Sequence, residues 1–510
     1  MAYVGTILSE LLKINKRIRK RLTKYDAGLQ EKTLRKLLSK ARSTRMGKRY
    51  GFKEMLLVED VYGEFSRRVP IYDYDKLHRE FWVHTLKGKR NITWPGKIKY
   101  FALTSGTSGS PSKRVPVSLR QIKAVRKASV RQMLSITDFN LPAEFYEKGV
   151  LMVGGTTTLR KIDAGYEGDL SGILQNNIPR WFDRFYKPGK KMAQILDWND
   201  KLDAMAMEAP KWDIGIICGV PAWIQMLFDR IKKFHNVKHI HEIWPNLSIY
   251  VHGGVSFTPY RESFRSYLGR DIHYLDTYLA SEGFLALQLA EHQKGMQLIL
   301  DNWVFFEFVP FNDSNFDADG NIRENPEVLT IEKVEEDVDY AILISTCSGA
   351  WRYLIGDTVR FRDKKNFEMI ISGRTKHFLS LCGEHLSVDN MNMGMRKAMD
   401  AFGVNANEYT VAGEPFEGSF RHHWYIGVDK DVDGEAFKRK LDEALCELND
   451  DYTTERKHAL KDPILEVIPI ERFYLYMELK GKAGGQNKFP RVIRNSQFEE
   501  WKRFLETGSL

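Results

Sequence analysis

The sequence predicts an α/β protein with three parts. These are a large N-terminal domain of mixed or parallel sheets flanked by helices, a β subdomain, and a small α+β C-terminal domain. First, strand-length apolar runs that end in Gly-rich or polar loops alternate with segments of helical spacing, which is typical of a largely parallel sheet. Second, strands follow one another with few helices between residues 296 and 371. Third, the alternation restarts beyond Gly373 in a shorter segment.

Length and periodicity predict the individual elements. Strands are expected where short apolar or β-branched runs lie between turn signals, and helices where apolar residues recur every three or four positions. The expected strands are 100–103, 149–153, 213–218, 247–251, 271–278, 296–311, 339–346, 357–361, 366–371, 409–412, 424–428 and most of 464–479. The expected helices are 119–135, 222–234, 258–268, 388–402, 435–449 and 497–505.

A chain of 510 residues is too long for a single core. We therefore expect two domains, residues 1–373 and 374–510. Within the first, Asp317-x-Asp319-Gly320 matches part of a calcium-binding loop but lacks its terminal Glu. We interpret residues 313–321 as a hairpin turn.

Composition is that of an ordinary soluble protein, with 43% apolar and 28% charged residues. No apolar run is long enough to span a membrane, and the first residues do not form a signal peptide. We therefore expect a cytoplasmic protein. Its four cysteines lie far apart, so neither a zinc motif nor disulfides are expected; they are Cys218, Cys347, Cys382 and Cys446.

The net charge of +10 is partly concentrated at the N-terminus, where residues 1–26 hold seven Lys or Arg against Glu10 and Asp26. Apolar residues recur there with helical spacing, and such a helix can touch anionic lipid or nucleic acid. A packing helix with a solvated basic face is the favoured interpretation. The remaining surplus is dilute along the chain, so we expect a monomer with no nucleic-acid partner and no membrane span.

The most informative stretch follows the apolar strand 100–103. Residues 104–110 are seven consecutive small residues rich in Gly, Ser and Thr, and Lys113 follows. Closely spaced backbone N–H groups and hydroxyls bind anionic oxygens, and a lysine is a common neighbour of nucleotide phosphates. The spacing is not that of the usual P-loop, and a flexible Gly/Ser linker is the alternative.

This loop and Lys113 resemble the phosphate loop of the adenylate-forming superfamily, which includes acyl- and aryl-CoA synthetases, non-ribosomal peptide synthetases and luciferase. The ending Lys113-Arg-Val-Pro116 is similar to that of the auxin-responsive (Gretchen Hagen) acyl acid amido synthetases, bacterial members included. The resemblance implies that ATP is bound by Thr104, Ser105, Gly106, Thr107, Ser108, Gly109 and Lys113.

A second motif is the Tyr278-x-x-Ser281-Glu282 segment at the end of a predicted strand. A serine followed by glutamate can offer a hydroxyl to a phosphate and a carboxylate to Mg²⁺, although Ser-Glu alone is common. In the family this segment is the second nucleotide motif. It would make Tyr278 a nucleotide-binding residue, Ser281 and Glu282 catalytic, and Glu282 the metal ligand. Ala280 departs from the pattern, because many members carry a second serine there.

Further motifs resemble the nucleotide pocket of the family. Residues 252–255, His-Gly-Gly-Val, resemble the loop along the adenine, which implies roles for Gly253, Gly254 and Val255. Asp357 follows Gly356 in a Tyr-Arg-x-Gly-Asp-like signature and would accept the ribose hydroxyls, a simple turn residue being the alternative. Arg374 would reach the ribose or the phosphates.

Two lysines and two apolar residues complete the resemblance. Lys376 stands where the family pivots its mobile C-terminal domain. Lys488, in a Lys-x-Pro-Arg segment, stands where a lysine enters the active site for adenylation; taken alone, it would be a surface lysine. Val220 and Trp223 could face an acyl pocket or simply pack.

The motifs together predict an ATP- and Mg²⁺-dependent acyl acid amido synthetase. It would convert a carboxylic acid to an acyl adenylate, release pyrophosphate, and pass the acyl group to an amino acid or other amine with release of AMP. A CoA ligase of the same superfamily is the first alternative, and a catalytically inactive nucleotide-binding protein is the second. The sequence does not identify the acid or the amine.

Overall fold

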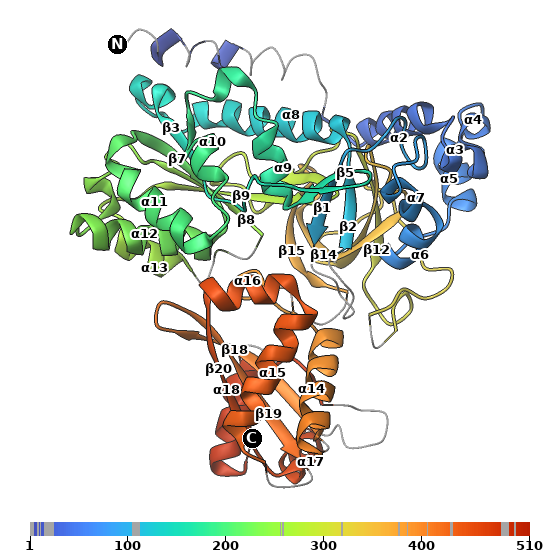
Figure 1. Ribbon diagram of the computed structural model, residues 1–510. Helices are drawn as coiled ribbons and strands as arrows, with labels where there is room; N and C mark the ends of the chain where they lie inside the picture. Colours follow the sequence, from blue (N-terminus) through green and yellow to red (C-terminus); the bar gives the residue numbers. More distant parts are fainter. Residues whose placement is uncertain are drawn as a thin grey trace. The chain divides into compact units, whose positions relative to one another are not determined.

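The computed structural model (Figure 1) describes most of the chain, in two compact units. Met1–Thr104 and Arg114–Thr375 belong to the first unit and Lys376–Leu510 to the second; the predicted boundary lies between 373 and 374. None of the described helices is long and apolar enough to cross a membrane. The described residues are 5–7, 10, 12–14, 25–104, 113–254, 257, 260–317, 320–375, 378–384, 386–404, 406–428, 432–480, 489–493 and 496–509.

Unit 1 is built on a long sheet, in which eleven of the described strands pair. In the spatial order given below, the five strands from β6 to β9 pair in parallel, and every pairing from β9 to β12 is antiparallel. The predicted β subdomain is therefore the antiparallel end of the same sheet. In spatial order the strands are β6 (Tyr186–Lys187), β3 (Gly149–Met152), β7 (Ile214–Cys218), β8 (Ile249–Gly253), β9 (His273–Ala280), β10 (Gly283–Leu287), β11 (Met296–Leu298), β15 (Glu368–Arg374), β14 (Tyr353–Asp363), β13 (Asp339–Thr346) and β12 (Val304–Pro310).

A second sheet of unit 1 carries the predicted phosphate-loop strand. Its order is β2 (Lys113–Val117), β1 (Tyr100–Thr104), β5 (Gly165–Gly168) and β4 (Arg160–Ile162). Glu167 on β5 is fully buried, and Arg114 Nε lies 2.6 Å from its carboxylate, with Arg160 as a second partner. A buried carboxylate needs such partners, so this pairing joins β2, β5 and β4.

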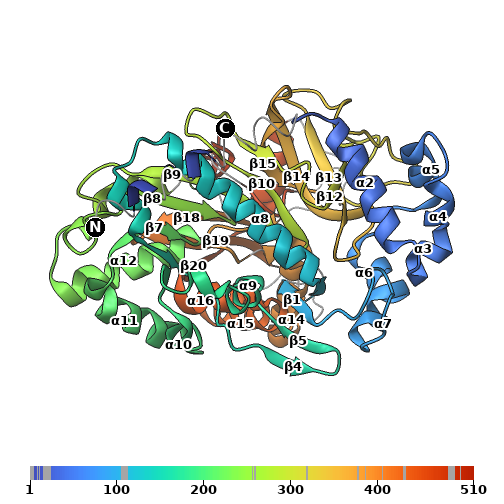
Figure 2. The same cartoon turned by 90° about the horizontal axis from the view of Figure 1, so that it is seen from above.

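Helices cover the two sheets of unit 1 (Figures 1 and 2). α8 begins directly after β2 because the Ser118 side chain accepts the Gln121 amide, a helix-starting cap. The helices are α2 (Gly28–Ala41), α3 (Arg45–Tyr50), α4 (Phe52–Met55), α5 (Val61–Arg68), α6 (Tyr74–Leu77), α7 (Val83–Leu86), α8 (Leu119–Ser135), α9 (Leu170–Asn176), α10 (Lys190–Ala193), α11 (Trp198–Glu208), α12 (Pro221–His235) and α13 (Arg261–Tyr267).

Unit 2 is a small α+β unit. Its sheet has the order β18 (Ala406–Phe416), β19 (Ser419–Val428) and β20 (Leu460–Val467), and β16 (Phe378–Leu379) pairs with β17 (Leu386–Ser387). Trp501 is fully buried against Phe473 and Tyr476. The helices are α14 (Val388–Phe402), α15 (Gly434–Leu448), α16 (Asp450–His458), α17 (Ile470–Leu479) and α18 (Ser496–Thr507).

A buried hydrogen bond between Glu384 and His422 fixes the turn before β17. Glu384 and His422 are both fully buried, and His422 Nε2 lies 2.9 Å from the Glu384 carboxylate. The same carboxylate accepts the amides of residues 381–383. Burial by itself raises the pKa of Glu384, but the hydrogen bonds from His422 and the backbone outweigh it and hold the pKa below its usual value.

Two sequence-based expectations are wrong in detail. The predicted strand 296–311 is two strands, because the chain turns at 299–303 and Trp303 adopts a left-handed φ of 66°. The predicted strand 464–479 ends at Val467, and α17 begins at Ile470. Its aromatic residues favour strands by propensity. However, Phe473, Tyr476 and Met477 are buried with helical spacing, so tertiary packing decides the conformation.

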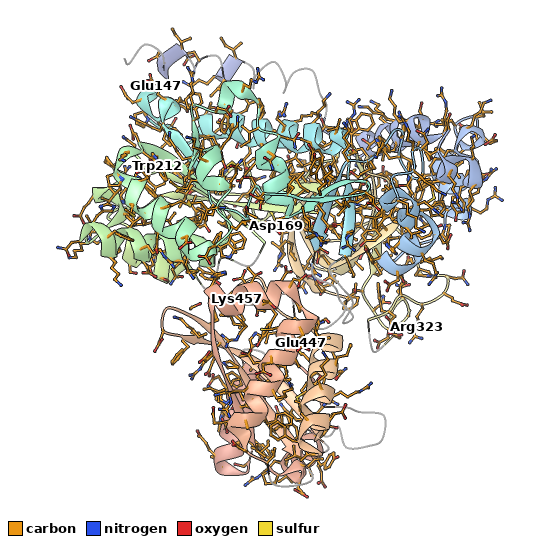
Figure 3. All side chains as sticks on the ribbon, in the orientation of Figure 1. Glu147, Asp169, Trp212, Arg323, Glu447 and Lys457 are labelled. Carbon is orange, nitrogen blue, oxygen red and sulfur yellow. The ribbon has the colours of Figure 1, made fainter. Side chains whose placement is uncertain are left out.

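Lys201 of α11 is a buried lysine. Only 2% of it is exposed, and its ammonium donates to the carbonyl oxygens of Gly154 (2.7 Å) and Gly155 (3.0 Å). Burial lowers its pKa to about 8, opposed by the carboxylate of Asp169 at the start of α9 (Figure 3). It ties α11 to the loop that follows β3.

We predict that Lys201 makes the stability of the protein rise with pH in the alkaline range. The pKa of Lys201 is lower in the folded protein than in the unfolded chain. Above about pH 8, this side chain is therefore protonated to a larger extent in the unfolded chain than in the folded protein. The free energy of unfolding should therefore rise by about 2 kcal/mol between roughly pH 7 and 9.5. Chemical denaturation of the wild type and of Lys201→Met across this pH range measures the free energy of unfolding of each protein. If the difference between the two free energies does not change with pH, the prediction is contradicted.

Candidate active site

The loops after three parallel strands of unit 1 meet at one edge of the sheet. Cys218 of β7 is in register with Val251 of β8, and Gly253 of β8 with Thr277 of β9. The segments that follow begin with Gly219, Gly254 and Ser281 respectively. In open α/β sheets, ligands bind outside the carboxyl ends of such strands.

The double glycine at the end of β8 is required by a close contact at Gly253 and by the backbone conformation at Gly254. A Cβ at Gly253 would lie 2.5 Å from the Thr277 carbonyl oxygen and 2.6 Å from its Oγ1, which itself donates to the His252 carbonyl at 2.7 Å. Gly254 has a φ of 86°, and a Cβ there would lie 3.6 Å from Val220. The predicted adenine loop and Val220 are therefore neighbours, and backbone rather than side chains forms this surface.

Tyr278, Asp357 and Arg374 come together in the structure. Asp357 on β14 is opposite Arg374 on β15, and Arg374 Nε lies 2.6 Å from Asp357 Oδ1. The Tyr278 hydroxyl donates to Asp357 Oδ2. Tyr278 and Asp357 are each 6% exposed. Burial, followed by the Asp357 charge, raises the pKa of Tyr278 well above its usual value, so its hydroxyl keeps its proton and remains a donor.

Glu282 lies in the tight turn between β9 and β10 and is buried. Burial raises the pKa of Tyr353 and that of Tyr278, and in both the negative charge of Glu282 raises it further. Glu282 is therefore electrostatically coupled to Tyr278, the tyrosine that donates to Asp357.

A buried polar network that the sequence did not reveal holds the neighbouring Ser281. Gln121 of α8 donates to the Ser281 carbonyl at 2.7 Å and accepts from the Ser348 hydroxyl. Ser348 Oγ in turn accepts the Ser118 amide at 2.9 Å. The partners in these hydrogen bonds are separated by 160 to 230 positions, and no local pattern marks them. The network fixes the second motif relative to the start of α8.

The two ends of the predicted phosphate loop belong to the paired strands β1 and β2. Thr104 ends β1, Lys113 begins β2, and both are half-buried. The next amide, that of Arg114, donates to the Tyr74 hydroxyl at 2.9 Å. The predicted site residues Ser105, Gly106, Thr107, Ser108, Gly109, Val255, Lys376 and Lys488 lie outside the described residues.

Trp223 in the first turn of α12 contacts Trp198 of α11, with ring centroids 4.8 Å apart. It is half-buried, so it packs between two helices beside Val220. Arg352, in the signature before Asp357, is not a surface cation. It is 5% exposed, pairs with buried Glu307 at 3.0 Å and donates to two backbone carbonyls; its role in the fold is structural.

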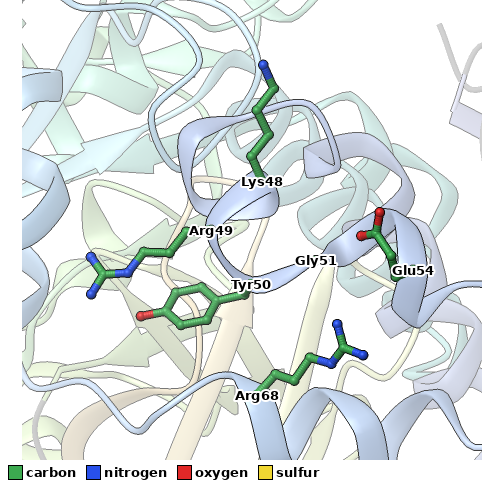
Figure 4. Close-up of a pocket in the computed structure, with 6 residues that line it drawn as sticks. All are labelled: Lys48, Arg49, Tyr50, Gly51, Glu54 and Arg68. Carbon is green, nitrogen blue, oxygen red and sulfur yellow. The ribbon is translucent and has the colours of Figure 1, made fainter.

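A shallow pocket lies elsewhere in unit 1, among α3, α4 and α5 (Figure 4). It contains none of the predicted site residues, and its arginines pair with Glu80 and Glu64. Among the described residues, no group of three or more His, Cys, Asp or Glu side chains could hold a metal ion. The pocket is lined by Lys48, Arg49, Tyr50, Gly51, Glu54 and Arg68.

Solved structures with this fold include an amido synthetase and a CoA ligase. GH3.15 acyl acid amido synthetase matches with a TM-score of 0.59 at 15% identity, over 97% of this chain and 95% of that one. 2-Hydroxyisobutyryl-CoA ligase in complex with 2-HIB-AMP and CoA matches with a TM-score of 0.58 at 12% identity, over 94% and 92%. The chain thus has the fold shared by an amido synthetase and a CoA ligase.

Family models cover most of the sequence. The GH3 family N-terminal domain matches residues 16–161 and 159–272, the GH3 family central domain residues 297–368, and the GH3 family C-terminal domain residues 389–497. The chain belongs to the GH3 family, which confirms the predicted family and the predicted α/β fold class.

Curated relatives include plant amido synthetases. Indole-3-acetic acid-amido synthetase GH3.10 of Arabidopsis thaliana is 23% identical over 50% of this chain and 46% of its own length. Jasmonoyl–L-amino acid synthetase JAR4 of Nicotiana attenuata is 25% identical over 54% and 49%. GH3.2 of Arabidopsis thaliana is 29% identical over 24% and 23%. The chain spans about half or less of the length of these relatives.

We predict that Gly253→Ala destabilises the protein, because a Cβ meets the Thr277 backbone, which cannot move without disturbing β9. Overpacking of this kind costs about 1–3 kcal/mol. Thermal unfolding measures the loss, and Gly434→Ala is the matched control, since a Cβ there meets nothing closer than 3.4 Å. Equal melting temperatures for the two variants would contradict the assigned contact.

Proposed function

We propose that this GH3 family chain is an ATP-dependent acyl acid amido synthetase. The carboxylate oxygen of an acid would attack the α-phosphorus of ATP, forming an acyl adenylate and releasing pyrophosphate. The nitrogen of an amino acid or other amine would then attack the acyl carbonyl, forming the amide and releasing AMP. Family models that match most of the chain support this proposal. The observation that carries it is the Tyr278–Asp357–Arg374 cluster, in which Tyr278 and Asp357 are buried.

In this proposal the cluster binds the ribose. Arg374 and Tyr278 hold the Asp357 carboxylate in a fixed orientation before a ligand arrives, so little ordering remains to be done on binding. A fixed carboxylate recognises a ribose diol by accepting its hydroxyl protons, as in dinucleotide folds. Gly253 and Gly254 leave backbone surface for the adenine. The phosphates would be held by Thr104, Ser105, Gly106, Thr107, Ser108, Gly109 and Lys113.

Glu282 suits Mg²⁺, because this ion takes one or two protein carboxylates and completes its shell with phosphate oxygens and water. When bound, the ion would neutralise the negative charge on the phosphates. Ser281 beside it would offer a hydroxyl to the α-phosphate. The Gln121–Ser348 network supports this role, since it fixes the Ser281 backbone from α8.

A lysine of unit 2 would supply a second positive charge, in addition to that of Mg²⁺. Lys488 would stabilise the α-phosphate as charge develops during adenylation, and Lys376 would be the pivot about which unit 2 moves between the two half-reactions. Val220 and Trp223, beside the adenine loop, would border the acid. We expect a monomer acting on small molecules.

Asp357→Asn tests the ribose assignment. Removing the negative acceptor should raise the KM for ATP about 10- to 100-fold, since a hydrogen bond to a charged group contributes roughly 1.5–3 kcal/mol. The assay is carboxylate-dependent exchange of labelled pyrophosphate into ATP. Asp337→Asn is the control, because Asp337 also pairs with an arginine but is exposed. An unchanged KM for ATP in Asp357→Asn would exclude the assignment.

Lys488→Ala tests the adenylation lysine. The variant should lose about 10²- to 10³-fold in adenylate formation, the usual effect of removing a pre-organised donor, yet still convert a supplied acyl adenylate to amide. Lys457→Ala, an exposed lysine of the same unit, is the control. Loss of both half-reactions in Lys488→Ala alone would contradict a role confined to adenylation.

A CoA ligase is the second candidate, because 2-hydroxyisobutyryl-CoA ligase shares this fold as closely as GH3.15 does. Competition decides between them. When one accepted acid is activated in the presence of both CoA and mixed amino acids, we expect the amide as the dominant product. A dominant thioester would overturn the amide assignment and leave adenylation intact.

A further inference from the structure

Two basic helices lie on the same face of unit 1. α8 contains five basic residues and no acidic one, and α2 contains four basic residues and one acidic one. Their surplus is diluted along the sequence, but the fold brings the helices to one face (Figure 2). We define the basic face by its exposed cations, which fall at helical spacing: Lys32, Lys36 and Lys40 on α2, and Arg120, Lys123 and Lys127 on α8.

A buried clamp fixes the spacing of these two helices. The turn between β11 and β12 is held from α2 by Gln30, which donates to the carbonyls of Leu300 (2.8 Å) and Val304 (3.1 Å). From the other side, Asn302 donates to the Ala124 carbonyl of α8 at 2.9 Å. The basic face is therefore a rigid surface.

Trp303 marks the centre of the basic face. Lys36 Nζ lies 4.0 Å from its ring centroid, and the Arg120 guanidinium lies 4.9 Å from it. Cations from both helices thus converge on one aromatic ring. Burial first, and then the charges of Lys127 and Arg120, lower the pKa of Lys36, as expected where like charges crowd together.

Little negative charge offsets these cations. Asp301 pairs with Lys127 at 2.7 Å, and Glu31 pairs with Arg35. Among the ion pairs of the described residues, no carboxylate pairs with Lys36, Arg120 or Lys123. A surface of this kind attracts polyanions.

An apolar side chain lies beside the same cations. Leu119, at the start of α8 and next to Arg120, is 56% exposed.

We propose that the basic face docks this protein on an anionic phospholipid surface. Each cation near such a surface strengthens binding about fivefold, and the exposed Leu119 side chain beside them would enter the headgroup region. Nucleic acid would use the cations but not Leu119. The Trp303 ring is engaged by two cations and by Trp94, so it is not a free platform for stacking bases. The proposal does not depend on the amide-forming activity.

Vesicle flotation of the full chain tests the proposal. The probes are vesicles of phosphatidylcholine with roughly one-third phosphatidylserine, vesicles of phosphatidylcholine alone, and a short DNA duplex. The test variant is Lys36→Gln/Arg120→Gln/Lys123→Gln. The matched control is Lys191→Gln/Lys233→Gln/Lys238→Gln, which removes three exposed lysines outside α2 and α8. A third variant, Leu119→Ser, keeps every charge.

We expect the wild type to bind anionic vesicles only, and more weakly as salt rises. The test variant should lose binding on the order of 100-fold, while the control triple variant binds like the wild type. Leu119→Ser should weaken binding to anionic vesicles although it keeps every charge. Melting temperature shows that each variant is folded; if the triple variant is not, Leu119→Ser and Lys40→Gln replace it. No vesicle binding by the wild type, equal loss in the control, or binding to DNA alone would overturn the proposal.

Discussion

A buried carboxylate must be paired, and the pairing of Asp357 constrains the shape of the long sheet of unit 1. Three strands separate β14 from β9 in the sheet order. On a flat sheet these two strands would lie roughly 19 Å apart, too far for the Tyr278 hydroxyl to reach Asp357. Their hydrogen bond therefore requires the sheet to curl between its parallel and antiparallel halves. The curl brings motifs that are 79 residues apart in the chain into one cluster.

The rest of the candidate site depends on a second set of buried contacts. Gln121 of α8 holds the Ser281 backbone, and Ser118 both begins α8 and bonds to Ser348 and Cys347. The helix after the predicted phosphate loop is thus joined to the second motif and to the turn before β14. Three motifs that the sequence separates are held by one network, which explains how a site assembled from long-range contacts is kept in place.

Local patterns were sufficient for much of the fold but not for the site. The helices 119–135 and 388–402 and the strand 339–346 were predicted to the residue, because each begins or ends at a strong signal such as the caps Ser118 and Ser387. The segment 464–479 was not, because packing against Trp501 overrides its strand propensity. The nearness of Tyr278, Asp357 and Arg374 was expected only through family resemblance, and Gln121 and Ser348 had no signal at all. The basic face could not be predicted either, because its cations are far apart in the sequence and come together only when α2 and α8 lie on the same face of the folded protein.

The pairing of β1 with β2 has a consequence for how this family can diversify. The eight residues between Thr104 and Lys113 connect two strands that are already neighbours. The ion pair between Arg114 of β2 and Glu167 of β5 holds the second strand in the sheet. Closing a longer connection costs little, about 0.6 kcal/mol for each doubling of its length. Evolution or an engineer can therefore exchange this connection for another of different length or composition, while the two strands that carry it keep their register.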